Sequence, residues 1–84
     1  MYKITVVVSK QEARNEALAV SYFGKSIEGV KSEIETLVLN AAKKLGASGK
    51  VTIGMIVEEH GKFYESDMKN AIISRDFKNI TYKF

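Results

Sequence analysis

Residues 26–46 have the sequence SIEGVKSEIETLVLNAAKKLG, and this stretch decides the fold. Its apolar residues recur at steps of three and four, the spacing that lines one face of a helix. Ser26 is placed to cap the first turn, and Gly46 is placed to end the last turn in a left-handed conformation. The sequence therefore predicts one long helix from Ile27 to Leu45, whose apolar stripe comprises Ile27, Val30, Ile34, Leu37, Val38, Ala41, Ala42 and Leu45.

Alternating apolar and polar residues predict strands on both sides of this helix. Two strands are expected before it, over residues 2–9 and 18–23. Strands are also expected over residues 50–58, 62–65 and 79–84. His60 and Gly61 form a candidate two-residue turn between the third strand and the fourth, because glycine accepts a positive φ at no steric cost.

Residues 67–75 leave two alternatives open. Met68, Ala71, Ile72 and Arg75 have helical spacing and favour a short helix, whereas residues 70–74 also fit a strand. The predicted fold is in either case a single α+β domain over residues 1–84, in the order β-β-α-β-β-(α)-β. We expect a mostly antiparallel sheet of four or five strands with the long helix packed on one face. The other face is left for solvent or a partner.

Composition restricts the classes of function. The chain of 84 residues contains no cysteine, which excludes disulfides, thiolate nucleophiles and cysteine–zinc sites. Its apolar runs, such as residues 6–8, are too short to span a bilayer, and residues 1–5 resemble a strand rather than an export signal. We therefore expect a cytoplasmic protein without a membrane partner.

Two short motifs are candidates for a phosphate-binding or a metal site. Residues 46–50, GASGK, resemble part of a phosphate loop, but Lys44 stands where the pattern needs a glycine, and the segment follows a helix rather than a strand. His60 follows Glu58 and Glu59, but neighbouring residues of a strand point to opposite faces and cannot share a metal ion. We expect no catalytic residue, no metal and no cofactor, and hence a protein that is not an enzyme.

Surplus apolar residues indicate a protein-binding surface. If the alternating residues of each strand face the helix, Val7, Ile56 and either Tyr22 or Phe23 point away from it. Such a patch on an uncovered sheet face is typical of association surfaces. The expected function is a small binding module that associates with itself, as a homodimer, or occupies, modulates or inhibits a larger protein. In size and class alone it resembles accessory proteins of phages and mobile elements.

Basic residues suggest an alternative, a small nucleic-acid-binding protein. The net charge is +3, a mild excess. Phosphate contacts would fall to lysines near the predicted end of the helix and near the end of the chain. These candidates are Lys43, Lys44, Lys50, Lys78 and Lys83.

Overall fold

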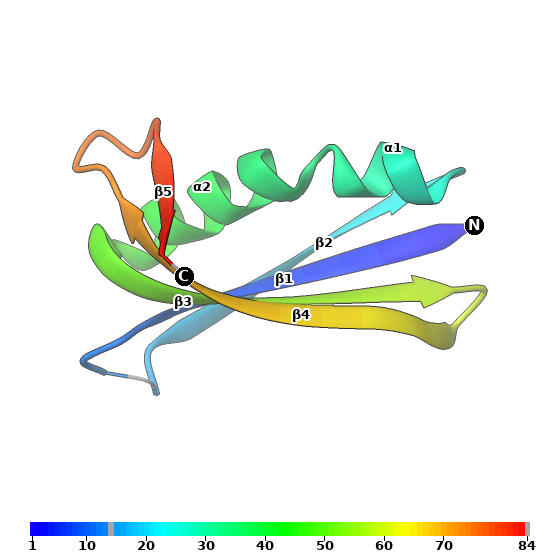
Figure 1. Cartoon of the computed structure of the whole chain (residues 1–84), viewed down its shortest axis with the longest axis horizontal. Coiled ribbons are helices and arrows are strands. Elements are labelled where there is room, and N and C mark those ends of the chain that lie inside the picture. The colour runs from blue at the N-terminus through cyan, green and yellow to red at the C-terminus, as the bar shows by residue number, and fades with distance from the viewer. Residues whose placement is uncertain (14, 84) are drawn as a thin grey trace.

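The computed structural model describes residues 1–13 and 15–83, and for Lys83 the backbone alone. A five-stranded sheet carries a bent helix on one face, which confirms the predicted α+β class (Figure 1). The elements are β1 (Tyr2–Lys10), β2 (Ala17–Gly24), α1 (Ile27–Lys31), α2 (Ile34–Leu45), β3 (Gly49–Glu59), β4 (Lys62–Ile73) and β5 (Ile80–Lys83).

Every pairing in the sheet is antiparallel, in the order β2-β1-β3-β4-β5. Strands β2 and β3 both flank β1 and therefore run parallel to each other, so the helix segments cross over β1 to connect them. The turn between β3 and β4 lies at His60 and Gly61, as predicted, with φ values of 50° and 79°. Both values suit a turn whose twist matches that of the strands it joins.

The long helix is confirmed at both ends but is bent in its second turn. The Ser26 hydroxyl accepts the N–H of Gly29 at 3.0 Å, and Gly46 ends α2 with φ 72°. The bend falls between α1 and α2, where the Ser32 hydroxyl donates to the Gly29 carbonyl at 2.7 Å. A serine that bonds back to the preceding turn competes with the helical hydrogen bonds and bends a helix.

The core lies between the helix and the strands beneath it. Val30, Val38, Ala41 and Ala42 are fully buried, whereas Ile27, Ile34, Leu37 and Leu45 of the same stripe are only half-buried. The facing sheet residues are Ile4, Val6, Val8, Val51, Ile53, Val57, Ala71 and Ile73. Both α1 and α2 make their main contacts with β1 and β2, so the helix layer lies chiefly over that half of the sheet.

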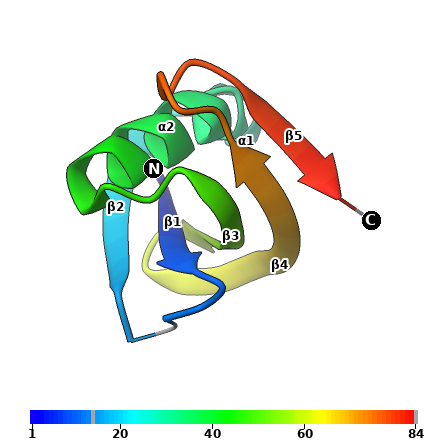
Figure 2. The ribbon, with the colours of Figure 1, turned by 90° about the vertical axis from the view of Figure 1, so that its left-hand side faces the viewer.

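Residues 67–73 are a strand, so the helix favoured for 67–75 is wrong. They continue β4 as far as Ile73, and Ala71 and Ile73 alternate inward with Ile72 between them. Figure 2 shows β4 curving upward until β5 runs across the open side of the helix layer. This curvature buries Ala71 and Ile73, and burial outweighs the weak helical spacing of the segment. Within the described residues, no helix is long and apolar enough to cross a membrane.

Candidate protein-binding surface

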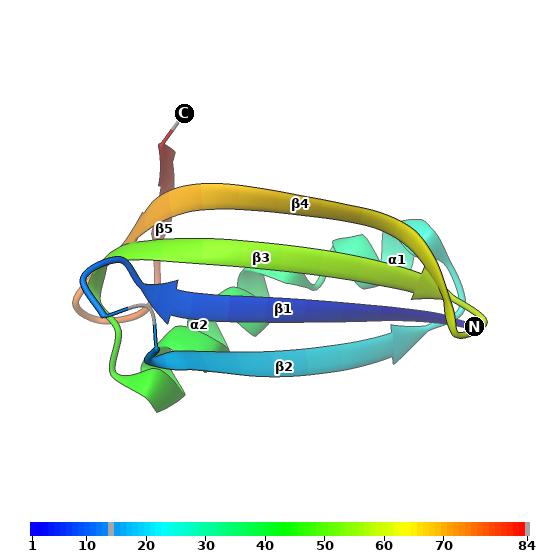
Figure 3. The same ribbon diagram turned by 90° about the horizontal axis from the view of Figure 1, so that it is seen from below.

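The sheet face opposite the helix is built from four rows that run across β2, β1, β3 and β4 (Figure 3). Residues paired in register share a face, so the pairings fix the composition of each row. We call these residues the uncovered face: Phe23, Lys3, Glu58, Phe63; Ser21, Thr5, Ile56, Ser66; Ala19, Val7, Gly54, Met68; Ala17, Ser9, Thr52, Asn70.

Charge is nearly absent from the uncovered face. Lys3 and Glu58 are the only ionisable residues of these four rows, and they stand directly opposite each other on neighbouring strands. Beyond the last row, Lys50 continues the same face of β3. The solvent side of the helix segments is different, because it exposes Glu28, Glu35, Lys43 and Lys44. A sheet face exposed to solvent usually carries charged and polar residues. A face with so few charges is typical of a surface that meets a partner.

A shallow depression of about 670 Å³ lies near the centre of the uncovered face. Gly54 leaves it open, because the absent side chain would stand in the middle of the third row. Val7, Ile56 and Met68 line it with apolar groups. A Cβ added at Gly54 would lie 4.0 Å from that of Val7, an ordinary contact, so the backbone tolerates a filled depression.

The structure brings together two of the four residues proposed from the sequence. Val7 and Ile56 both line the depression, and Ile56 is 42% exposed. Phe23 lies at one end of the same face, with the Lys3 ammonium 5.7 Å from its ring centroid. Tyr22 lies on the helix side, because it pairs with the buried Ile4.

Three further residues of this face were missed in the sequence. Phe63 and Met68 are the most exposed large apolar side chains, at 70% and 73%. Phe63 lies in a strand that was predicted correctly but whose faces were not assigned, and Met68 was placed in a helix. The available signal for Gly54 was its position inside a strand, where glycine often marks a site of close approach.

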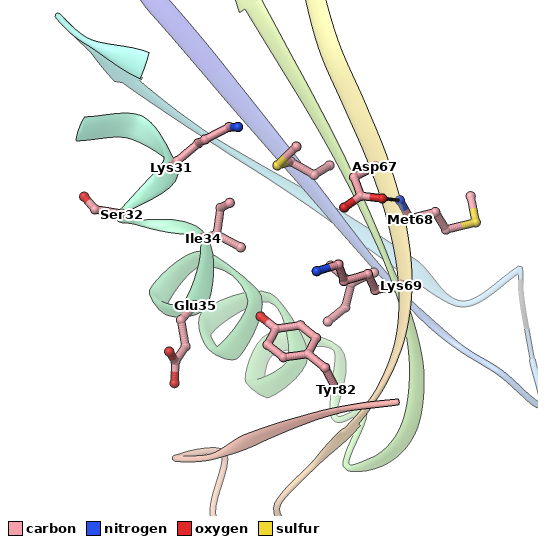
Figure 4. A pocket seen from close by; sticks show the side chains of 10 residues that line it. Lys31, Ser32, Ile34, Glu35, Asp67, Met68, Lys69 and Tyr82 are labelled. Atoms are coloured by element: carbon pink, nitrogen blue, oxygen red, sulfur yellow. Dashed lines mark hydrogen bonds between the residues drawn. The ribbon is translucent and has the colours of Figure 1, made fainter. Parts of the chain in front are cut away.

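A second hollow of about 330 Å³ lies on the helix side, between the bend of the helix and strands β4 and β5 (Figure 4). Ile53 and Met55 of β3 line its apolar part. Lys31, Glu35, Asp67 and Lys69 supply its charges, and Tyr82 reaches in from β5. The hollow exists because the helix bends and β5 turns across the sheet.

The charged groups of this hollow are engaged with other parts of the fold. Lys31 forms an ion pair with Glu65 at 2.7 Å, and Lys69 lies 5.4 Å from the ring centroid of Tyr82. Asp67 accepts the N–H of Met68 at 2.8 Å. Burial, and secondarily the Glu35 carboxylate, raises the pKa of the Tyr82 phenol. These contacts fix the walls of the hollow.

Metal ligands do not converge within residues 1–13 and 15–83, where no three His, Asp or Glu side chains form a cluster. His60 lies at the β3–β4 turn, with Nδ1 3.1 Å from the nitrogen of Met1. Glu59 accepts the phenol hydrogen of Tyr2 at 3.4 Å, and its carboxylate raises the pKa of that phenol.

The candidate phosphate-binding lysines gather at one end of the molecule. Lys43 and Lys44 occupy the last turn of α2, Lys50 begins β3, and Lys78 lies in the β4–β5 loop. Figure 1 shows the end of α2 and this loop at the same end of the molecule, and all four side chains are exposed. The side chain of Lys83 lies outside the described residues.

Comparison of the chain with protein-family models, with curated proteins and with solved structures finds no match.

Proposed function

We propose that the protein is a non-catalytic, cytoplasmic binding module whose uncovered face occupies the surface of a larger protein and modulates or inhibits it. The observation that carries this proposal is the composition of that face. Exposed Ile56 and Met68 line a depression, and exposed Phe23 and Phe63 lie at one end of the same face. The four rows hold only one pair of opposite charges, Lys3 and Glu58. Aromatic residues and methionine are enriched at the cores of protein interfaces, whereas lysine and glutamate are depleted.

The size of the face is compatible with this role. Four strands spaced about 4.8 Å apart and eight residues long at about 3.3 Å each give about 500 Å². A partner of matching area brings the total to about 1,000 Å², near the lower bound for a specific interface. Apart from Ile56 and Met68, the two middle rows carry small side chains that allow close approach, while Phe23 and Phe63 supply anchors at one end.

Charged substitutions in the depression test the proposal. Val7→Lys and Ile56→Glu each place a charge where the partner would exclude water, so the affinity should fall at least about tenfold. Thr36→Lys and Asn40→Glu are matched controls, because both residues are exposed on the helix segments. A photoreactive phenylalanine analogue at Phe63 first cross-links the target in cells, and calorimetry with the purified target then compares the four variants.

The outcome depends on the contrast between the two sets. Binding weakened only by Val7→Lys and Ile56→Glu, with unchanged melting curves, supports the proposal. Equal affinity of all four variants, or loss of folding in both face variants, contradicts it.

Nucleic-acid binding is a second candidate, favoured by the gathering of Lys43, Lys44 and Lys78 at one end of the molecule. Each phosphate contact releases counterions, so the affinity should fall steeply as salt rises. Fluorescence anisotropy with labelled RNA and DNA measures this slope. Replacing these three lysines by alanine should reduce the slope of log affinity against log salt concentration by about three units, one for each lost phosphate contact. Absence of binding at low salt excludes nucleic-acid binding.

A further inference from the structure

Strand β2 is the first strand of the sheet, and its outer edge is open. Among the described residues, no backbone hydrogen bond is recorded from Ala17–Gly24 except those to β1. Figure 3 shows β2 at the margin of the sheet, with no strand beyond it. The edge therefore displays unpaired backbone donors and acceptors, which is the usual template for strand addition.

The pairing pattern identifies which backbone groups are unpaired. Lys10 donates its N–H to the Glu16 carbonyl, whereas Gln11 donates to Lys50 of β3. Hydrogen-bonded pairs alternate along antiparallel strands, so even-numbered residues of β1 bond to β2 and odd-numbered ones to β3. In the register observed, the residues of β2 whose N–H and C=O groups point outward are Ala17, Ala19, Ser21 and Phe23.

The sequence of this edge lacks the usual protection against pairing. Ala17–Gly24 contains no charged residue and no proline, and its pairing with β1 proceeds without a bulge. Natural edge strands are commonly blunted by lysine, proline or a bulge. An eight-residue edge without any of these devices is suited to a partner strand.

We infer that β2 pairs antiparallel with β2 of a second copy of this chain and forms a continuous ten-stranded sheet. The inference goes beyond the proposed function, because it concerns a second surface, the edge of β2, and a second copy of the chain as its partner. A two-fold axis at Val20 pairs Ala17 with Phe23 and Ala19 with Ser21 of the other copy. This register satisfies all four outward residues of each strand, whereas a shift by two residues leaves one unpaired on each copy.

Side chains in this register are complementary. On the helix side, Leu18 faces Tyr22 and Val20 faces its own copy. On the uncovered face, the small Ala17 lies opposite the large Phe23. Aromatic–aliphatic and β-branched pairs stabilise neighbouring strands, and no like charges meet because β2 carries none. The uncovered faces of both copies then remain accessible on the same side of the joined sheet.

Sedimentation velocity across a concentration series of the full chain should show a monomer–dimer equilibrium. Ser21→Pro removes an outward N–H but no bond to β1, and it should weaken the dimer by more than about tenfold. Ser21→Thr keeps both the N–H and the hydroxyl that lies 3.0 Å from that of Thr5, so it is the matched control. A wild-type protein that stays monomeric at submillimolar concentration overturns the inference.

A cysteine cross-link tests the register independently of how Ser21→Pro folds. The chain contains no cysteine, so Val20→Cys introduces a single thiol. At the two-fold axis the two Cα atoms lie about 4.5–5.5 Å apart, within disulfide range. Leu18→Cys is the control, because its two copies stand about 13 Å apart along the strands. Mild oxidation should link the first variant and not the second, and the reverse result overturns the register.

These results separate this inference from the proposed function. Val7→Lys, on β1, should abolish target binding without dissociating the dimer, whereas Ser21→Pro should dissociate the dimer and Ser21→Thr should not. A dimer that is lost with Val7→Lys but kept with Ser21→Pro places self-association on the uncovered face and overturns pairing through β2.

Discussion

The outer edge of β2 and the free part of β4 differ in how they limit strand pairing. On β2, four residues present outward backbone groups in an uninterrupted row without charge. On β4, the bulge at Val57 and Glu58 interrupts one end and β5 pairs with Asn70–Ile73 at the other. By the same alternation, only Ser66 and Met68 present regular outward groups there.

Side chains reinforce the difference. Glu65, Asp67 and Lys69 alternate along the free part of β4, whereas the corresponding positions of β2 are Leu18, Val20 and Tyr22. The free part of β4 is therefore protected against further strands, and the edge of β2 is not. One long unprotected edge favours a closed two-fold dimer, whereas two would permit open-ended assembly.

The largest expected effect concerns the helix packing that stabilises β2 but not the free part of β4. The helix segments pack on β1 and β2 and leave the free part of β4 without a covering helix. Val38→Ala removes two methyl groups from a fully buried side chain of α2 and should lower the free energy of unfolding by about 2–3 kcal/mol. Met68→Ala, at an exposed position of β4, should change it by less than about 0.5 kcal/mol. Urea unfolding measures both, and equal losses would refute the asymmetry.

A smaller effect is expected when the protection of β4 is removed. Replacing Asp67 and Lys69 together by valine leaves the net charge unchanged and gives β4 a neutral, β-branched edge. Light scattering should then detect species larger than a dimer, because both edges accept strands. Glu28→Val with Lys43→Val, two exposed helix residues, is the charge-matched control. Assembly no larger than that of the control would show that these charges do not protect the edge.

The smallest expected effect concerns the loop that holds β5 against β4. The Ser74 hydroxyl donates to Asp76 at 2.6 Å and accepts the N–H groups of Lys78 and Asn79. Ser74→Ala should lower the free energy of local opening of β5 by about 1 kcal/mol. Amide exchange in residues 80–83 should therefore become faster. Thr36→Ala, an exposed hydroxyl on α2, serves as control. Unchanged exchange would indicate that burial alone holds β5.

Acidification should have the same local effect. The Ser74 hydroxyl and then the Lys78 N–H hold the pKa of the Asp76 carboxyl below its ordinary value. The ionised Asp76 carboxylate therefore contributes fully to stability above the pKa that this group has in the unfolded chain. This contribution is lost as the pH falls through the lowered pKa of the folded state. Exchange in β5 should rise over that acidic range in the wild type and change less in Ser74→Ala.

Periodicity predicted the elements of this fold better than its surfaces. The helix ends at Ser26 and Gly46 were predictable because capping depends on local chemistry. The bend at Ser32 was missed because a single side-chain hydrogen bond decides it. Residues 67–73 were misassigned because their strand is exposed over half its length and shows alternation only at Ala71 and Ile73.

The candidate surface was predicted in part for a related reason. Val7 and Ile56 follow from alternation within their own strands, so their common face was accessible from the sequence. The face on which Tyr22 lies is set by the register between β1 and β2. The same register decides which backbone groups of β2 point outward. Register is a property of strand pairs, and one sequence without a known pairing does not specify it.

The central position of β1 also determines how the chain folds. Its pairing with β2 joins residues 8 to 22 positions apart, from Ser9–Ala17 to Tyr2–Gly24. Its pairing with β3 joins residues 41 to 57 positions apart, from Lys10–Val51 to Tyr2–Glu59. Because distant contacts close at a larger entropic cost, the β1–β2 hairpin should form early and the docking of β3 should limit the rate. Until β3 docks, the valine-rich β1 stays open to intermolecular pairing, so refolding yield should fall as protein concentration rises.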